Sequence, residues 1–280
     1  MTEPNRSVRL AIVIVNFNTD AALSTCLKSL HEPPPEVSHQ IVVVDNGSTD
    51  GSVHTVRATW PSVRVVEMGR NAGFAAATNT GVYASESDLL LMLNSDTHVP
   101  KGSIDRLIEA LDADPSSAAV GPRLVAPDGL TELSFGRMMS PWNEAYQKLL
   151  TLSLSKRIFP FTLWLDHRSS SAHHPDWVSG ACLLVRRSCG DTVGWLDERF
   201  FLYGEDVDFC ASLRAAGHRI LFSPTADVVH ARGQSGSAEP AKTQTLYRRS
   251  QLAFYAKHHP QWFRLLRCYL RLRGQLPAPE

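Results

Sequence analysis

Acidic and amide side chains follow the predicted strands of the first hundred residues, and these groups are the ones most suited to chemistry. Asn16 and Asn18 follow the first apolar run, Asp45 follows the second, and Asn94 and Asp96 follow the fourth. In an open parallel sheet, ligands bind in the crevice outside the carboxyl ends of the strands. We therefore expect these side chains, which are far apart in the sequence, to converge on one binding site.

Asp96 is a candidate metal ligand. It closes the string Asn94-Ser95-Asp96 after a very apolar strand, and Mg²⁺ prefers one or two protein carboxylates completed by phosphate oxygens. A carboxylate at this place can hold a divalent cation against a diphosphate. The alternative is a turn in which the aspartate caps a helix before Pro100, which is a common use of aspartate.

Three carboxylates, Glu205, Asp206 and Asp208, open a predicted helix in the second half of the chain. Carboxylates in a first helical turn often only complement the helix dipole and cap its free N–H groups. Here the preceding residues 196–202 are largely apolar and aromatic, which would place the carboxylates at the edge of a partly dry cleft. Such a setting raises the pKa of a carboxyl group and can make it a working general base.

His230 ends the last predicted strand and precedes a stretch rich in glycine and serine. A histidine at a strand end is usually structural, but a neutral imidazole is also a frequent metal ligand. Both interpretations stay open at this point.

The elements that position these groups alternate between strand and helix. In the first half, apolar runs predict strands at 10–16, 40–44, 63–67 and 89–93, and helical spacing predicts helices at 20–30, 53–59 and 73–84. Buried strands that alternate with helices of about ten residues predict an α/β protein with a parallel sheet and right-handed crossovers.

The pattern changes in the second half. The sequence predicts helices at 104–111 and 206–216 and strands at 118–121, 177–185 and 220–222. Residues 142–166, within the segment 138–166, are rich in large apolar side chains without clear periodicity, and we expect a flexible or helical insert that covers a site. Two further helices, at 246–258 and 261–273, are separated by Pro260.

Charge is balanced in total but not in distribution. The 280 residues carry 28 basic and 28 acidic side chains and are 43% hydrophobic, which is typical of a globular protein and excludes a disordered one. The neutral total argues against a nucleic-acid-binding protein, because phosphate neutralisation needs a surplus of Lys and Arg. Residues 241–280, however, hold eight of the basic side chains and one of the acidic ones. We expect an acidic domain joined to a basic C-terminal element.

The five cysteines are odd in number, widely spread and without a Cys-x-x-Cys pair. They indicate neither a disulfide framework nor a zinc site, and a reducing cytoplasm fits them best. No apolar run reaches the ~20 residues of a membrane span, and the N-terminus lacks the pattern of a signal peptide.

Together the motifs resemble glycosyltransferase family 2. The matching strings, in order, are Ile14 to Asn18, Val43 to Ser52, Arg70 to Phe74 with Asn79, Asn94 to Asp96, Val178 to Ala181, Phe200 to Asp208, and His230. The resemblance runs from about Leu10 to Ser237. It implies a GT-A fold, with a mostly parallel central sheet flanked by helices and a C-terminal helical extension. The expected parts are a nucleotide-sugar-binding half at 1–97, an acceptor and catalytic half at 98–237, and a basic extension at 238–280.

The resemblance also implies roles for individual residues. Asp45 would hydrogen-bond a pyrimidine base, and Asn16 or Phe17 would line the nucleoside pocket. Asn71, Gly73 and Asn79 would lie near the base and the diphosphate. Gly180 and Ala181 would permit a close backbone approach to the donor sugar and the acceptor. Asp96, with Asn94 and Ser95 before it, would bind Mg²⁺ or Mn²⁺, and His230 would be a second protein ligand.

Asp206 would be the catalytic base, and Glu205 would orient the site or bind acceptor hydroxyls. The base takes the proton of an acceptor hydroxyl as its oxygen attacks the anomeric carbon from the face opposite the diphosphate, while the metal neutralises charge on the leaving group. One displacement of this kind inverts the anomeric centre. Many relatives have aspartate where this chain has Asn94, so Asp96 and His230 would hold the cation with less help.

The Asn-Ser-Asp form is similar to the bacterial rhamnosyltransferase branch of the family, which implies dTDP-L-rhamnose as the donor. The alternative donor is a UDP-hexose or a UDP-N-acetylhexosamine. A sugar-phosphate nucleotidyltransferase is disfavoured, because the loop after the first strand is Asn-Phe-Asn-Thr and lacks Gly, Arg and Lys. A carbohydrate-binding protein without catalysis is disfavoured by the presence of Asp96 and Asp206.

The last predicted helix, 261–273, is basic and amphipathic, with Arg264, Arg267 and Arg271 on one face. Such a helix suits the surface of an anionic membrane. The protein would then lie at the inner face of the plasma membrane, and its acceptor would be a lipid-linked glycan in cell-surface polysaccharide synthesis. The alternative is a helix packed on the acidic domain, with its arginines facing the acidic excess. The sequence leaves the oligomeric state open.

Overall fold

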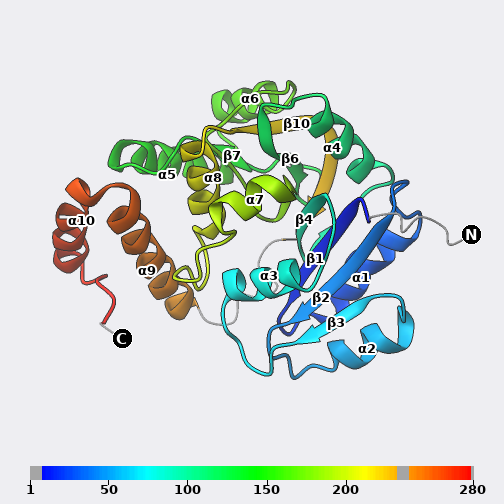
Figure 1. Cartoon of the computed structure of the whole chain (residues 1–280). Helices are drawn as coiled ribbons and strands as arrows, with labels where there is room; N and C mark the ends of the chain where they lie inside the picture. The colour runs from blue at the N-terminus through cyan, green and yellow to red at the C-terminus, as the bar shows by residue number, and fades with distance from the viewer. Residues whose placement is uncertain (1–7, 232–239, 279–280) are drawn as a thin grey trace, which may run out of the picture.

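The computed structural model describes residues 8–231 and 240–278. Its centre is an eight-stranded sheet in the order β3-β2-β1-β4-β9-β6-β10-β5, with helices on both faces (Figure 1). The expected α/β architecture with a mostly parallel sheet is confirmed. Residues 232–239 lie outside the described residues, and with them the end of the predicted resemblance at Ser237 and the start of the predicted extension at residue 238.

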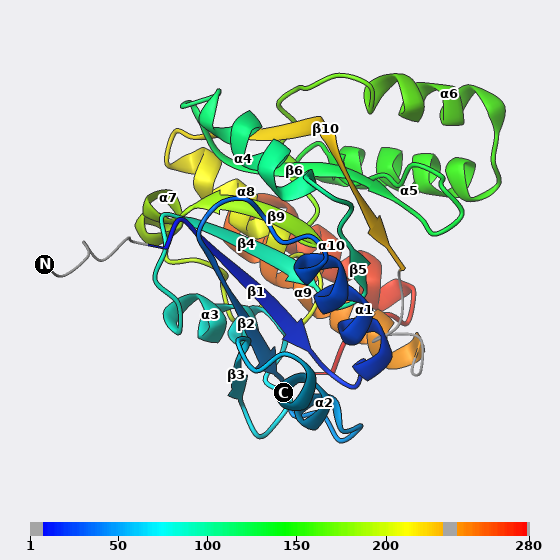
Figure 2. The same ribbon diagram turned by 90° about the vertical axis from the view of Figure 1, so that its right-hand side faces the viewer.

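The first half is the predicted alternation of parallel strands and helices. Its elements are β1 (Leu10–Asn16), α1 (Asp20–His31), β2 (His39–Asp45), α2 (Ser52–Thr59), β3 (Arg64–Glu67), α3 (Phe74–Tyr83) and β4 (Leu89–Asn94). β1 lies between β2 and β4, and the register pairs Asn16 with Asp45 and Val15 with Asn94. Because these strands are parallel, Asn16, Asp45 and Asn94 come together at one edge of the sheet. Figure 2 shows β2, β1 and β4 running side by side.

The second half extends the same sheet. Its elements are β5 (Thr97–His98), α4 (Ser103–Asp112), β6 (Ser117–Val125), β7 (Phe135–Gly136), α5 (Pro141–Ser155), α6 (Phe159–Arg168), β8 (Trp177–Val178), β9 (Cys182–Arg186), α7 (Arg187–Val193), α8 (Glu205–Ala215) and β10 (Arg219–His230). β5 straddles the predicted boundary between residues 97 and 98 and pairs with β10 in the common sheet. The segment 142–166 is helical and forms α5 and most of α6.

The prediction of one strand at 177–185 is wrong. The chain forms β8, which pairs with β7 in a separate two-stranded sheet, and β9, which runs antiparallel between β4 and β6. Residues 179–181 connect the two strands. The apolar pattern of the segment indicates that it is buried. It does not indicate that the two ends of the segment pair with different sheets.

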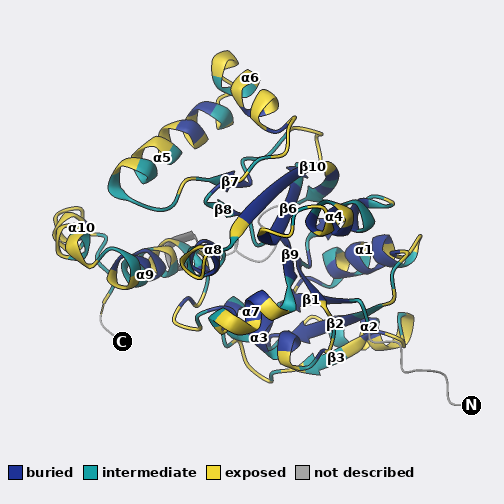
Figure 3. Ribbon diagram, turned by 45° about the horizontal axis from the view of Figure 1, so that its top comes forward, coloured by how far each residue is buried: buried dark blue, intermediate teal, exposed yellow. Residues whose placement is uncertain are grey.

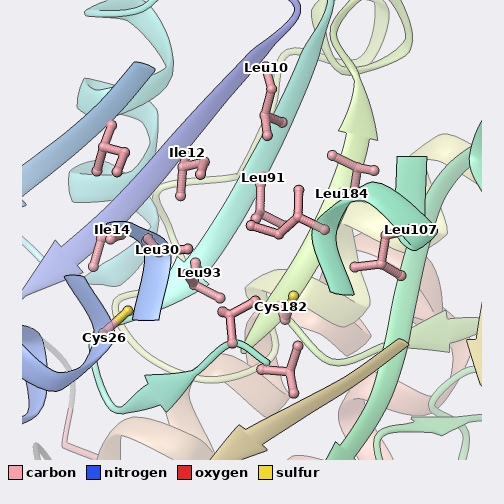
Figure 4. Close-up of a cluster of buried hydrophobic side chains, with 14 of the residues drawn as sticks. Leu10, Ile12, Ile14, Cys26, Leu30, Leu91, Leu93, Leu107, Cys182 and Leu184 are labelled. Atoms are coloured by element: carbon pink, nitrogen blue, oxygen red, sulfur yellow. The ribbon is translucent and has the colours of Figure 1, made fainter. Parts of the chain in front are cut away.

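Two apolar clusters cover the two faces of the large sheet. Leu10, Ile12 and Ile14 of β1 belong to one cluster together with Leu91 of β4 (Figure 4), and the residues between them point to the other. α1 and α4 contribute to the first cluster, and α3, α7 and α8 contribute to the second. A strand that is buried on both faces is a continuous apolar run, and this is why the sequence predicts β1 and β4 so clearly.

The C-terminal helices α9 (Pro240–His258) and α10 (Pro260–Leu272) pack on the rest of the molecule. Phe254 and Tyr255 of α9 are buried in a third apolar cluster with Phe200 and Val207. Trp262, Phe263 and Leu266 at the start of α10 pack against this cluster. The predicted arginine face of α10 is exposed. Among residues 8–231 and 240–278, no helix combines the length and the apolar character needed to cross a bilayer.

Asp208 ties α9 to α8. Its side chain is 1% exposed, and its oxygens accept hydrogen bonds from Lys257 Nζ at 2.8 Å and from His258 Nε2 at 2.6 Å. Lys257 Nζ also lies 3.0 Å from Asp197 Oδ2. The acidic domain and the basic C-terminal element therefore meet at these groups, and Asp208 serves the packing of α9.

We expect Asp208→Asn to lower the free energy of unfolding by about 1–3 kcal/mol, because Lys257 and His258 lose a buried anionic acceptor. Urea unfolding measures this loss, and limited trypsin digestion should release α9 and α10 earlier than in the parent protein. The matched control is Asp88→Asn. Asp88 is 57% exposed and lies 3.5 Å from Arg9, so its loss should matter little. Equal stability of the two variants would contradict this role of Asp208.

Candidate active site

Three strand ends are joined by hydrogen bonds that start from Asn16. This side chain is fully buried, and its Nδ2 donates to Asp45 Oδ1 at 3.1 Å and to Ser52 Oγ at 2.7 Å. Thr19 Oγ1 donates to Asn16 Oδ1 at 2.7 Å and lies 2.9 Å from Ser95 Oγ. Asn16 therefore fixes the loops that follow β1, β2 and β4. Because Asn16 has no exposed surface, it supports these loops from within the protein and does not present its side chain to a ligand.

Asp45 organises the loop that follows β2. The residue is 4% exposed, and its Oδ2 accepts hydrogen bonds from the N–H groups of Gly47 at 3.2 Å and Ser48 at 3.0 Å. Gly47 has φ of +85°, and a Cβ there would lie 2.7 Å from the backbone of Arg70. Only glycine allows this approach. The loop after β2 thus lies against the loop that precedes α3.

Asn46 joins these two loops. It lies within the matching string Val43 to Ser52, but the resemblance implied no role for it. Its Nδ2 donates to Asn71 Oδ1 at 3.1 Å, and its Oδ1 accepts from the N–H of Ala72 at 2.9 Å. Gly73 follows with φ of +93°, and a Cβ there would lie 2.7 Å from the carbonyl oxygen of Phe201. Asn71 and Gly73 therefore lie between the Asp45 loop and the segment that leads to α8.

Asn79 lies apart from these groups. It is 4% exposed on α3, its Nδ2 donates to Leu196 O at 2.8 Å and to Glu198 Oε1 at 3.0 Å, and its Oδ1 accepts from the N–H of Leu196. These contacts use both ends of the amide. Any influence of Asn79 on a bound ligand therefore acts through the segment that carries Phe200 and Phe201.

Asp96 and His230, the two predicted metal ligands, are neighbours. Asp96 Oδ1 lies 3.3 Å from His230 Nε2, and the side chains are 9% and 12% exposed. The N–H of Ala231 donates to the carbonyl oxygen of Asp96 at 2.9 Å, which holds the end of β10 beside this loop. Asn94 Nδ2 is 3.4 Å from His230 Nε2. The antiparallel pairing of β5 with β10 thus brings together two residues that are 134 positions apart.

Glu132 is a site residue that the sequence did not indicate. Its Oε2 lies 3.3 Å from His230 Nδ1, on the side of the ring opposite Asp96. Burial by itself would lower the pKa of His230, but the hydrogen bonds and charges of Asp96 and Glu132 outweigh it and raise the pKa to about 9. A carboxylate that holds the second ring nitrogen is the usual way to orient a metal-binding histidine.

The donor set fits a divalent cation whose coordination is completed by a ligand. Two ligands about 2.1 Å from a cation and at right angles to each other are about 3 Å apart, which is close to the separation of Asp96 Oδ1 and His230 Nε2. In the part of the chain that the structure describes, no group of three His, Cys, Asp or Glu side chains is arranged to hold a metal. Asp96 and His230 would supply two ligands, and phosphate oxygens would fill other positions.

Glu205 and Asp206 lie at the start of α8, after Gly204. Asp206 Oδ2 accepts a hydrogen bond from the N–H of Gly180 at 2.9 Å. Burial raises the pKa of Asp206, and this hydrogen bond offsets the rise in part. Burial and the nearby charge of Asp206 raise the pKa of Glu205 to about 8. Glu205 is 7% exposed, and its Oε2 has no hydrogen-bond partner among the described residues.

Gly180 and Ala181 connect the carboxylate pair to the Asp96 loop. The N–H of Gly180 donates to Asp206, and the next carbonyl, that of Ala181, accepts from the N–H of Asn94 at 2.9 Å. Two adjacent residues thus touch both groups. The site combines a carboxylate of raised pKa with a carboxylate–imidazole pair, a combination suited to proton removal beside a bound anion.

Gly180→Ala tests how closely Asp206 must be placed. A Cβ at position 180 would lie 3.1 Å from Asp206 Cβ and 3.5 Å from its Oδ2, so the carboxylate must shift by a few tenths of an ångström. We expect kcat to fall about 10- to 100-fold, since small misplacements of a reacting group are costly, while the KM for the donor stays within a small factor. Steady-state kinetics measures both. A parental kcat would show that the position of Asp206 is not critical.

Comparison with known proteins shows the family to which the chain is similar. The profile of "Glycosyl transferase family 2" matches residues 11–166. The N-acetylglucosaminyl-diphospho-decaprenol L-rhamnosyltransferase of Mycobacterium tuberculosis is 32% identical over an alignment of 291 positions. The alignment covers 95% of this chain and 92% of that protein.

Two solved structures share the fold. The mannosyltransferase PcManGT from Pyrobaculum calidifontis, in complex with GDP-Man and Mn²⁺, has a TM-score of 0.61 at 19% identity and covers 96% of this chain and 71% of its own. GalNAc-T7 with UDP, GalNAc and Mn²⁺ has a TM-score of 0.62 at 16% identity and covers 99% and 59%. This likeness is one of fold, and the expected GT-A fold is confirmed.

Proposed function

The chain belongs to glycosyltransferase family 2, and from this premise we propose that it transfers L-rhamnose from dTDP-L-rhamnose to a hydroxyl of a lipid-linked glycan, with inversion at the anomeric carbon. The observation that carries the chemistry is the bridge of Gly180 and Ala181, which joins Asp206 to the loop of Asn94 and Asp96. A base and an anion-binding site are thereby held on the two sides of one reacting centre.

Asp206 is the base in this proposal. Its carboxylate takes the proton of the acceptor hydroxyl as the hydroxyl oxygen forms a bond to the anomeric carbon. The bond from that carbon to the diphosphate oxygen breaks, and the nucleoside diphosphate leaves from the opposite face. The raised pKa of Asp206 makes it a stronger base than an exposed aspartate. The N–H groups of Gly180, at 2.9 Å, and of Val207, at 2.8 Å, donate to Oδ2 and Oδ1 of Asp206 and fix the orientation of the carboxylate.

Asp96 and His230 would hold Mg²⁺ or Mn²⁺, which when bound neutralises negative charge on the diphosphate. Glu132 orients His230 through its ring Nδ1. Asn94 and Ser95 shape the loop, and Ser95 is held by Thr19. Support for a divalent cation comes from the Mn²⁺ in the two similar structures and from the separation of the two ligands.

The donor nucleotide would bind at the edge formed by β1 and β2. Asp45 and the half-buried Phe17 face the base, and Asn71 and Gly73 border the base and the diphosphate. Asn16, Asn46 and Asn79 position these groups from buried places. The activity of the relative from Mycobacterium tuberculosis supports L-rhamnose. A UDP-hexose or a UDP-N-acetylhexosamine is the alternative donor.

The acceptor would approach from the side of Glu205. The buried Oε2 of Glu205 has no protein partner among the described residues and is free to bind or orient an acceptor hydroxyl beside Asp206. The name of the same relative supports a polyprenyl-diphosphate-linked glycan. Contact of residues 261–273 with an anionic membrane fits such an acceptor, since Arg264, Arg267 and Arg271 are exposed. The predicted location at the inner face of the plasma membrane follows from this proposal.

A donor screen tests the proposal. Thermal shifts of the protein are measured with dTDP-L-rhamnose, UDP-glucose, UDP-N-acetylglucosamine and GDP-mannose, each with and without Mn²⁺. We expect the largest shift with dTDP-L-rhamnose and Mn²⁺, and turnover of that donor with a polyprenyl-diphosphate-linked N-acetylglucosamine. Proton NMR of the product reports the anomeric configuration. A larger thermal shift with a UDP-sugar would show that the donor is the UDP-sugar and not dTDP-L-rhamnose. If the protein binds no nucleotide sugar, the proposal is overturned.

A further inference from the structure

The helical hairpin formed by α5 and α6 has an unusually apolar surface. Sixteen large hydrophobic side chains are exposed among the described residues, and eight of them lie within residues 142–164. They are Trp142, Tyr146, Leu149, Leu152, Ile158, Phe159, Leu163 and Trp164. Trp142 is 77% exposed and Phe159 is 72% exposed. A concentration of this kind on a soluble surface marks a site of interaction.

The exposed residues of α5 follow helical spacing. Trp142, Tyr146, Leu149 and Leu152 are separated by four, three and three positions, so they lie along one side of the helix. Leu165 of α6 is buried in the second apolar cluster, and Leu154 of α5 packs against that cluster. The apolar side chains on the outside are therefore not needed for this packing. Figure 3 shows the exposed surface of α5 and α6 away from the sheet.

The charges of the hairpin are arranged with basic groups outward. Lys148, Lys156, Arg157 and Arg168 are exposed, as is Asp166 of α6. Arg157 Nη2 lies 3.2 Å from Asp128 Oδ2, so the exposed charge of the hairpin and its partner is basic in sum. The acidic group of α5, Glu144, is turned toward α9, where it accepts hydrogen bonds from Tyr255 Oη at 2.7 Å and Gln251 Nε2 at 2.6 Å. Apolar and aromatic side chains beside Lys and Arg are the composition of helices that lie in the interface of an anionic bilayer.

The hairpin is inserted at the acceptor side of the site. It connects β7 to β8, which pair with each other. Three residues before β7 stands Glu132, the partner of His230, and two residues after β8 stands Gly180, the partner of Asp206. α10 lies on the same side of the molecule as α5 (Figures 1 and 3) and exposes Leu265 and Leu272 beside its arginines. The exposed surfaces of α5 and α10 can therefore contact the same flat membrane.

We propose that the α5–α6 hairpin is a bilayer-docking surface, whose exposed aromatic and leucine side chains enter the headgroup region of an anionic membrane. Charge favours a membrane over a second copy of this chain. In a symmetric contact, the basic surface with Lys148, Lys156 and Arg168 of one copy would meet the same surface of the other, whereas anionic lipid headgroups complement these groups. Docking here places the site next to the membrane surface, where the glycan of a lipid-linked acceptor lies. That last step rests on the proposed function.

The test is sedimentation of the full chain with vesicles of phosphatidylcholine and phosphatidylglycerol, without donor or acceptor. The variant Trp142→Ser/Phe159→Ser/Leu163→Ser alters exposed side chains, so the fold should persist. We expect about tenfold or more weaker vesicle binding and unchanged turnover of a water-soluble acceptor. The matched control is Tyr83→Ser, which alters a 69% exposed aromatic residue on α3 and should bind vesicles like the parent.

Three outcomes overturn the proposal. The triple variant binds vesicles as the parent does, or Leu265→Ser/Leu272→Ser on α10 alone abolishes binding while the triple variant retains it. In the third outcome, the parent is a dimer by light scattering and does not bind vesicles, and the triple variant is a monomer, so that a second copy covers the hairpin. Because vesicle binding is measured without substrate, its result is independent of whether the donor assignment is correct.

Discussion

Asp206→Asn is expected to lower kcat about 10²–10⁴-fold, which is the usual contribution of a general base. The substitution keeps the size of the side chain, and its one oxygen can accept from the N–H of Gly180 or from that of Val207, which donate to Oδ2 and Oδ1 of Asp206. An amide cannot take the proton of an acceptor hydroxyl. Donor binding should be unchanged, because Asp206 lies on the acceptor side of the Gly180–Ala181 bridge. Turnover is measured with saturating donor, and donor binding by calorimetry.

The pH dependence gives an independent test of the same assignment. A base must be ionised, and burial raises the pKa of Asp206, so kcat/KM should rise with pH from the acidic side. The neighbouring Glu205, with a pKa raised to about 8, titrates together with Asp206, and the apparent values belong to the pair. The charge of Asp206 is one cause of the raised pKa of Glu205, so Glu205 is protonated and neutral over the acidic limb. Glu205→Gln should therefore leave that limb in place and remove the second ionisation of the pair.

The matched control for the aspartate is Asp88→Asn, since Asp88 is exposed near the opposite edge of the sheet, before β4 begins. It should retain parental kcat and a parental pH profile. A parental kcat in Asp206→Asn would show that another group takes the proton. An acidic limb that moves in Glu205→Gln would show that Glu205, and not Asp206, ionises first.

Asp96→Asn is expected to lower kcat/KM about 10²–10³-fold at a fixed low Mn²⁺ concentration. The cation is worth several kcal/mol to a reaction in which charge grows on the diphosphate, and each tenfold in rate corresponds to about 1.4 kcal/mol. The neutral amide of Asn94 already stands beside His230, so no second carboxylate of this loop compensates for the loss. Chelation with EDTA should abolish turnover, and Mn²⁺ should restore it in the parent.

Glu132→Gln should have a smaller effect than Asp96→Asn. Glu132 contacts Nδ1 of His230, whereas the proposed metal-binding nitrogen is Nε2. Its loss should weaken Mn²⁺ binding about 10–100-fold, as is usual for the partner of a metal-binding histidine, and high Mn²⁺ should restore most of the turnover. Titration of activity with Mn²⁺ measures both variants. Activity that persists in EDTA at the parental rate would exclude a role of the cation.

The first half of the fold can be predicted from the amino-acid sequence. Strands such as Leu10–Asn16 and Leu89–Asn94 are buried on both faces, so their residues form continuous apolar runs that stand out from the helices. Parallel order then requires that Asn16, Asp45 and Asn94 meet at one edge, as the register has it. The motifs around Asp96, Asp206 and His230 predicted the family, because chemistry at a site restricts residue types within short segments.

The sequence does not distinguish the polar residues that lie at a ligand surface from those that hold neighbouring residues in place. The tertiary structure makes this distinction. Asn16 and Asn79 are buried supports, and Asp208, one turn from Glu205, anchors α9. Glu132 joined His230 without any local signal. Whether a side chain faces a ligand depends on what packs against its other side, and those neighbours come from segments about 50 to 120 positions away. Local patterns carry burial and residue chemistry, but the pairing of distant segments is set by the packing of the whole chain.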